Sequence, residues 1–236
     1  DFARAKVLVR RAARAFGARE VVARARCVVA EAEIALAARE LTWPARALEA
    51  ARAALQLHGD RVNAAHARYL EIRRSLLLGR LAEAERLLSK HDPMRLPAPL
   101  RAAHELFVAG IAIRRLKTHA ATHALDRALN AAREAGIPAL EAEGESAGQL
   151  LVAPAARLLA QGHEETLRLA DVESLLDSNV LVVDGWRHAV HAGGRKVDLR
   201  RRPVLFTLAR VLAEAWPGPA SREALIHRAF RIRQPD

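Results

Sequence analysis

The chain has 236 residues, of which 51% are hydrophobic but only 4% aromatic, and its formal net charge is +11. Its single cysteine, Cys27, excludes an intrachain disulfide and a Cys-rich zinc site, and no apolar run reaches the ~18 residues that a membrane-spanning helix needs. A core poor in aromatic residues must be built from Ala, Leu and Val, which pack well between closely spaced helices. We therefore expect a mainly α protein of two domains, located in a reducing cytoplasm.

Helical patterns alternate with short breaks from Ala3 to about Leu151. The breaks contain residues that end helices, and they fall at residues 17, 42–44, 59–60, 79–80, 91–99, 117–119 and 136–138. The second helices of successive pairs are expected to begin near Pro44, Leu81 and Ala120, which lie 37 and 39 residues apart. Two helices in each unit of about 34 to 45 residues are typical of an α-solenoid.

The turn at residues 76–85 resembles that of a tetratricopeptide repeat. In this segment Gly79 ends one helix, and Ala82 and Ala84 allow the next helix to pack closely against it. The resemblance implies a tetratricopeptide-like helical domain over residues 1–152. Such a domain would sense an effector or form a homodimer, and its groove would hold a peptide or protein partner.

Beyond Pro154 the pattern changes to short strands. We expect strands over 156–159 and 166–169, a short helix over 171–176, a buried strand over 180–183, and a hairpin whose strands, 189–192 and 195–199, flank Gly193-Gly194. A helix follows from Val204 to Trp216 with Pro203 at its first position, then a turn over 217–220 and a second helix from Ser221 to Phe230. The apolar stripe of the first helix, and Trp216 at its end, are expected to face a core.

The residues of the second helix, Ser-Arg-Glu-Ala-Leu-Ile from Ser221 followed by Ala229-Phe230, carry a second resemblance. They are similar to the DNA-binding domain of OmpR/PhoB-type winged-helix regulators, as are residues 197–199 leading into Pro203. The resemblance implies a small α+β winged-helix domain over residues 153–236, within a bacterial transcriptional regulator that binds double-stranded DNA. The base-reading third helix and the wing of that family would lie beyond Asp236. No phosphate-receiver domain precedes the domain, and Arg200 to Pro203 replace the Thr and Glu that commonly open the first helix.

Basic residues concentrate in the same stretch, where ten Lys and Arg residues between Arg195 and Arg233 stand against three acidic ones. Phosphate contacts fix the register of a protein on DNA without reading its sequence. For each single Arg, a solvated surface charge is the alternative interpretation. The candidate phosphate contacts are Arg200, Arg201, Arg202, Ser221, Arg222, Arg228, Arg231 and Arg233.

No constellation of residues predicts an enzyme, a cofactor or a metal site. His119 and His123 stand four residues apart on a predicted helix, but no further ligand follows at motif spacing, so we expect ordinary surface histidines. Gly144 to Gly148 matches part of a nucleophile elbow but follows a helical pattern, so we expect the frayed end of a helix. The alternative to a DNA-binding regulator is an adaptor, in which the solenoid groove holds a partner and the winged-helix domain makes protein contacts.

Overall fold

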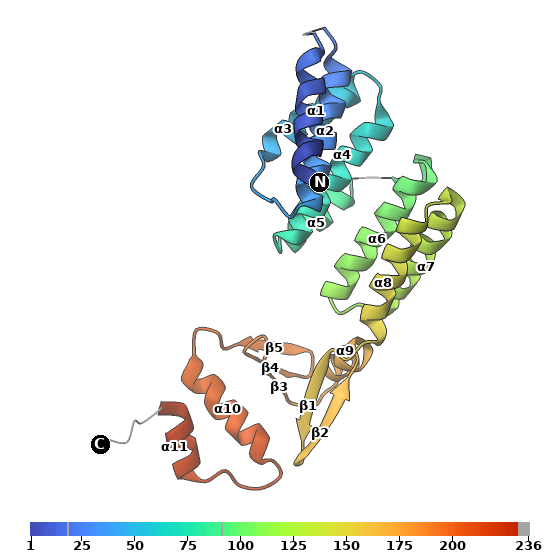
Figure 1. Ribbon diagram of the computed structural model, residues 1–236. Helices are drawn as coiled ribbons and strands as arrows, with labels where there is room; N and C mark the ends of the chain where they lie inside the picture. The colour runs from blue at the N-terminus through green and yellow to red at the C-terminus, as the bar shows by residue number, and fades with distance from the viewer. Residues whose placement is uncertain (18, 91, 231–236) are drawn as a thin grey trace. The chain divides into compact units, whose positions relative to one another are not determined.

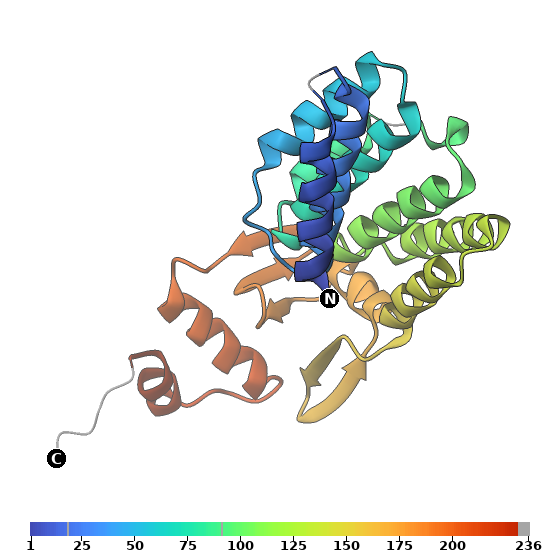
Figure 2. The ribbon, with the colours of Figure 1, turned by 45° about the horizontal axis from the view of Figure 1, so that its top comes forward.

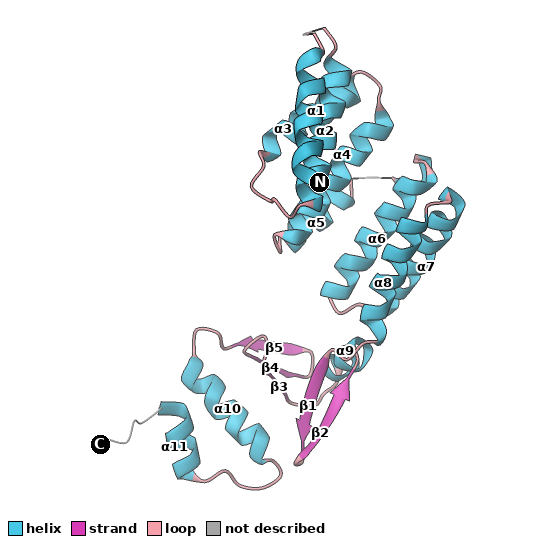
Figure 3. Ribbon diagram, in the orientation of Figure 1, coloured by secondary structure: helices cyan, strands magenta, loops and turns pink. Residues whose placement is uncertain are grey.

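The computed structural model describes residues 1–17, 19–90 and 92–230. It is mainly helical, with small antiparallel sheets in its C-terminal part, which confirms the predicted fold class at that level (Figures 1 and 3). The chain divides into two compact units. Unit 1 comprises residues 1–115 and 119–148, and unit 2 comprises residues 116–118 and 149–236.

In unit 1 each helix from α1 to α5 contacts the next along the chain, and α6, α7 and α8 lie side by side (Figures 1 and 2). Short connections keep consecutive helices adjacent, as in an αα-hairpin. A short 3-10 helix, η1 (Pro93–Arg95), stands between the fifth and sixth of these helices. The helices are α1 (Phe2–Ala15), α2 (Val21–Ala37), α3 (Ala45–Leu57), α4 (Arg61–Leu77), α5 (Leu81–Leu88), α6 (Ala98–Arg114), α7 (Thr118–Ala135) and α8 (Pro138–Val152).

One turn type closes several of these helices. After α4, Gly79 has φ +72°, and the Arg80 N–H donates to the Ser75 carbonyl at 2.8 Å, which satisfies an otherwise orphaned helix-end acceptor. The same pattern ends α2, where Arg39 takes the left-handed conformation with φ 60°. A residue with a Cβ pays roughly 1–2 kcal/mol for this conformation. The local backbone hydrogen bonds of the helix end accompany this conformation even where the sequence lacks glycine.

The core of unit 1 lies between consecutive helices and is rich in alanine. One cluster joins α2, α3 and α4 around Leu48 and Leu55, a second joins α4, α5 and α6 around Ile72, and a third joins α6 and α7. The buried faces of α2 to α7 are shared between neighbouring helices rather than enclosed within one helix pair. The core therefore continues from one helix to the next along unit 1.

Gly144 corrects one expectation from the sequence. It lies inside α8 and is buried, whereas the sequence pattern was interpreted as a frayed helix end. A Cβ at this position would lie 2.8 Å from Cδ2 of Leu129 on α7. The glycine therefore serves close packing of α8 against α7, and the helix continues to Val152.

Unit 2 begins with two small sheets and one helix. β1 (Ala156–Ala160) pairs with β2 (His163–Leu167) in an antiparallel hairpin, and α9 (Leu169–Asp177) follows. A three-stranded antiparallel sheet has the order β3-β4-β5, with β3 (Val182–Asp184), β4 (Ala189–Ala192) and β5 (Arg195–Asp198). The predicted hairpin turn is confirmed, since Gly193 and Gly194 have φ values of 53° and 72°.

The predicted buried strand over 180–183 is wrong in its first half. Val180 and Leu181 are exposed, and β3 begins only at Val182, which is paired with His191. The Ser178 hydroxyl accepts the Val180 N–H and holds this segment in a local turn. The apolar run therefore has no partner strand until residue 182, so its β-branched residues do not form a continuous strand.

A membrane crossing has no structural basis in the described residues, because none of their helices has both the length and the apolar character that it requires.

Candidate nucleic-acid interface

Two helices at a turn close unit 2. They are α10 (Pro203–Ala215) and α11 (Arg222–Phe230), and their bounds agree with the sequence prediction to within one residue at each end. Phe206 is buried, and its ring meets that of His188 edge-on at 4.6 Å between centroids. The Leu199 N–H donates to the His188 carbonyl at 2.8 Å. These contacts fix the start of α10 against the three-stranded sheet.

The apolar stripe on α10 is only partly covered. Val211 is buried, but Leu205 and Leu212 are about half exposed, so only part of the stripe that was expected to face a core does so. Trp216 was expected to pack in the core, yet it is 68% exposed. It lies at the C-cap of α10, where the chain turns away at Pro217, so its indole falls outside the contact between α10 and α11.

Arg200, a candidate phosphate contact, is engaged within the chain. Its guanidinium donates to both carboxylate oxygens of Asp198, with an Nη2–Oδ2 distance of 2.5 Å, and its backbone N–H donates to Oδ1. These bonds hold the pKa of Asp198 at about 2, well below its usual range, so the carboxylate stays charged at neutral pH. A phosphate must compete with Asp198 for this cation.

Arg228 is also paired. Its guanidinium lies 2.5 Å from Oε2 of Glu214, whose other oxygen accepts from Arg210 at 2.6 Å. Glu214 thus joins α10 to α11. Hydrogen bonds from Arg210 and Arg228 lower its pKa, against the opposing effect of partial burial. Arg228 therefore contributes to the angle between the helices, and is less available to DNA than its sequence position indicates.

The remaining described candidates are available. Arg201 and Arg202 are exposed ahead of α10 and Arg222 is exposed at the first position of α11, and within residues 1–17, 19–90 and 92–230 none of the three forms an ion pair. Arg231 and Arg233 lie outside the described residues. The structure thus separates the basic cluster into paired and unpaired cations, a distinction that sequence reasoning missed.

Ser221 occupies the position that the sequence predicts. Its hydroxyl accepts the Ala224 N–H at 3.1 Å, the expected N-cap bond of α11. One of the amides that the helix end would present to an anion is therefore already satisfied. Glu223 in the same turn carries the only acidic side chain of the first turn and opposes a phosphate there. The N-terminus of α11 is consequently a weaker anion site than its dipole alone implies.

The two unpaired groups lie at opposite ends of α10 in the chain. Arg201 and Arg202 precede α10, whereas Arg222 follows the turn after it. A helix of 13 residues is about 20 Å long, at ~1.5 Å per residue. The major groove of B-DNA is ~12 Å wide. The chain therefore places these cations at two separate positions, before α10 and after the turn that follows it.

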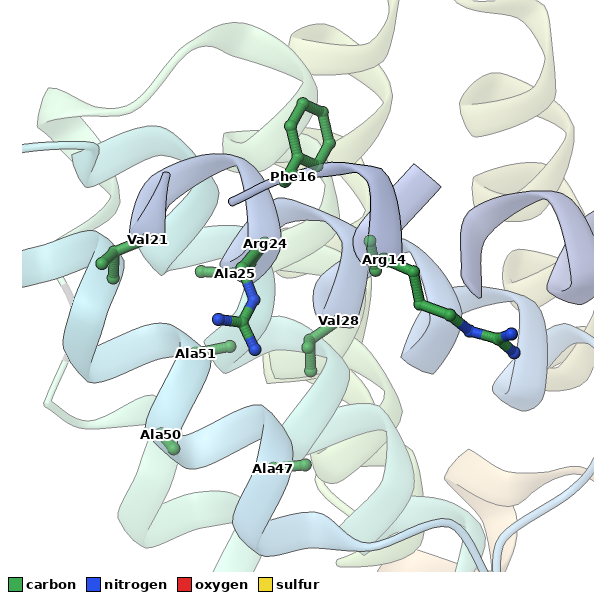
Figure 4. A pocket seen from close by; sticks show the side chains of 10 residues that line it. Arg14, Phe16, Val21, Arg24, Ala25, Val28, Ala47, Ala50 and Ala51 are labelled. Carbon is green, nitrogen blue, oxygen red and sulfur yellow. The ribbon is translucent and has the colours of Figure 1, made fainter. Parts of the chain in front are cut away.

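Unit 1 contains an open groove of ≈ 590 Å³ between α1, α2 and α3. Alanine side chains form much of its wall, and Figure 4 shows the Arg24 guanidinium pointing between Ala51 and Val28, whereas Arg14 extends away from the alanines. Neither arginine has an ion-pair partner among the described residues. The residues lining the groove are Ala13, Arg14, Phe16, Val21, Arg24, Ala25, Val28, Ala47, Ala50 and Ala51.

Three residues that matter for the interface were absent from the sequence prediction. Asp198 and Glu214 occupy two of the cations, and Phe206 fixes α10 on the sheet. The spacing of Arg210 and Glu214, four apart on one helix, was a usable signal for an ion pair. The pairing of Glu214 with Arg228 had no such signal, because it depends on how α10 packs against α11.

Within the part of the chain that the structure describes, no group of three or more His, Cys, Asp or Glu residues is placed to hold a metal ion. Comparisons of the chain with protein-family models, with curated proteins and with solved structures find no match.

Proposed function

We propose that the chain is a DNA-binding transcriptional regulator, in which unit 2 is a winged-helix domain and unit 1 a tetratricopeptide-like solenoid that senses an effector or mediates dimerisation. The observation that carries the proposal is the set of unpaired, exposed cations at both ends of α10, in a helix-turn-helix that follows a small antiparallel sheet. Chain order and charge agree with the resemblance to OmpR/PhoB-type regulators.

In this proposal Arg201, Arg202 and Arg222 neutralise DNA phosphates and set the orientation of unit 2. Base reading belongs to a third helix, as in the winged-helix family that the sequence resembles. Affinity then comes largely from release of counterions, so it falls steeply as salt rises. Two such domains in a symmetric dimer would engage paired half-sites one helical turn apart.

Fluorescence anisotropy of the whole chain on a labelled duplex from its own promoter tests the proposal. We expect binding at low salt, and a plot of log K against log salt whose slope becomes shallower by about 0.9 for each phosphate contact removed. Arg201→Gln and Arg222→Gln should each reduce the slope in this way. Arg46→Gln, which removes an exposed charge of unit 1 that has no ion-pair partner among the described residues, is the matched control. Binding that is absent at low salt, or insensitive to salt, contradicts the proposal.

The groove of unit 1 favours a second candidate function, an adaptor that binds an acidic amphipathic helix of a partner protein. Small side chains allow a helix to approach closely, and Arg14 and Arg24 are cations without carboxylate partners in the described structure. A photo-crosslinking residue at the exposed Ala50 tests it, with one at Asn130 on α7 as control. Crosslinks from position 50 to an acidic helical segment support the adaptor. Crosslinks to DNA, or none above the control, contradict it.

A further inference from the structure

The outer face of α7 carries two imidazole side chains that the proposed function does not use. His119 and His123 are both exposed, and their Nε2 atoms lie 3.1 Å apart. Their ring centroids are 4.3 Å apart, with an angle of 85° between the ring planes. Both residues belong to unit 1 and to one helix, so the helix backbone itself fixes their separation.

This separation matches what two nitrogen ligands of one ion require. Metal–nitrogen bonds of 2.0–2.1 Å with an angle of ~90–110° at the metal place the two nitrogens about 2.9–3.4 Å apart. The observed Nε2–Nε2 distance of 3.1 Å falls inside that range. An ion can therefore replace the hydrogen bond between the rings without a change of helix geometry.

The donor set selects the class of ion. Imidazole nitrogens favour borderline transition metals such as Zn²⁺, Cu²⁺ and Ni²⁺, whereas Mg²⁺ and Ca²⁺ prefer oxygen ligands. Among the residues that the structure describes, no third His, Cys or carboxylate joins the pair. Other coordination positions are thus left to water or to an external ligand, as in open rather than structural zinc sites.

We propose that His119 and His123 chelate one divalent transition-metal ion on the surface of α7. Each Nε2 donates its lone pair to the ion, and the ring proton resides on Nδ1. The two ligands act together, because once one is bound the helix holds the other at a high effective concentration.

Isothermal titration of the whole chain with ZnCl₂, and separately with CuCl₂, tests the proposal. We expect one ion per chain at this site, with at least about tenfold weaker binding in His119→Asn and in His123→Asn, because each variant loses the linked second ligand. His58→Asn is the matched control, since it removes an exposed histidine of unit 1 from a different helix end. Circular dichroism checks that each variant retains its helix content.

Electron paramagnetic resonance of the Cu²⁺ form reports the number of nitrogen ligands directly. A change in protein stability alone would not alter this number. The parent should show two nitrogen ligands, and each single variant should lose that signature. The proposal is overturned if both single variants bind within about threefold of the parent, if His58→Asn loses as much affinity as they do, or if millimolar Mg²⁺ displaces the ion.

Discussion

The core between α2 and α6 of unit 1 and the α10–α11 pair of unit 2 differ in how completely they bury their apolar side chains. Leu48, Leu55 and Ile72 in unit 1 are fully buried, whereas α10 and α11 in unit 2 leave Leu212 and Phe230 more than half exposed. Unit 1 is held by continuous contacts between neighbouring helices. In unit 2, Phe206 anchors α10 on the three-stranded sheet and Glu214 links α10 to α11. The comparison predicts that the largest stability losses follow truncation of core side chains in unit 1.

Leu55→Ala should have the largest effect on unit 1. The side chain is 0% exposed, so its truncation leaves a cavity and should lower the free energy of unfolding by about 2–5 kcal/mol. Leu57→Ala on the same helix is the control, because Leu57 is 83% exposed. Urea denaturation followed by circular dichroism measures both. Equal effects would show that α3 is not packed as described.

Phe206→Ala is the corresponding change in unit 2. Phe206 is 8% exposed and supports the start of α10, so we expect a loss of about 3 kcal/mol, confined to unit 2. Leu212→Ala, at a 53% exposed position of the same helix, should cost well under 1 kcal/mol. Hydrogen exchange measured by mass spectrometry separates the two units. If exchange in α3 rises as much as in α10, the units do not unfold independently.

Two glycines of α8 should respond with opposite signs to the same substitution. Gly144→Ala places a methyl group 2.8 Å from Leu129 and should destabilise unit 1 by about 1–3 kcal/mol. Gly148→Ala meets nothing within 4 Å and should stabilise the helix by roughly 0.5–1 kcal/mol. Thermal melting of both variants gives the comparison. A stabilising Gly144→Ala would contradict the close approach of α7 and α8.

Glu214→Gln should have the smallest effect on stability, below about 1 kcal/mol, because the ion pairs are largely solvated. The folded pKa of Glu214 lies below its ordinary value of 4.5, so the carboxylate stabilises unit 2 fully above that pH. This contribution is lost as pH falls below 4.5 through the folded value. The variant should thus lose less stability than the parent between pH 6 and pH 3.

Glu165→Gln, an exposed change in the same unit, controls for that titration. The Glu214 variant also releases Arg228, so its affinity for duplex DNA at low salt should rise. If the variant shows the same dependence of stability on pH and the same affinity for duplex DNA as the parent, Glu214 does not hold Arg210 and Arg228 in solution.

The sequence predicted the positions of most helices and strands, but it predicted less well which of their side chains are buried and what they contact. The helix breaks at Gly59 and Gly79, and the hairpin turn at Gly193-Gly194, follow from local conformational preferences, so they could be predicted. The environments of Trp216 and Gly144 could not. Whether an indole is covered, or a glycine is needed for close approach, depends on residues distant in sequence.

The candidate interface shows the same division. The sequence places Ser221 at the N-cap of α11, and the structure retains that bond because it is local. The sequence also locates the basic cluster, but it does not distinguish the arginines that are free to bind phosphate from those that are paired. The structure separates the paired Arg228 from the unpaired Arg222, since Glu214 reaches Arg228 only through the packing of α10 on α11.

By itself, the amino-acid sequence determined the mainly helical class, the order of the elements and the accumulation of positive charge near the C-terminus. These depend on the periodicity, caps and composition of short segments. Only the tertiary structure decided which cations are free and which glycine permits helix contact. Those properties depend on distances between side chains, which the packing of neighbouring elements and the rotamers on each helix set.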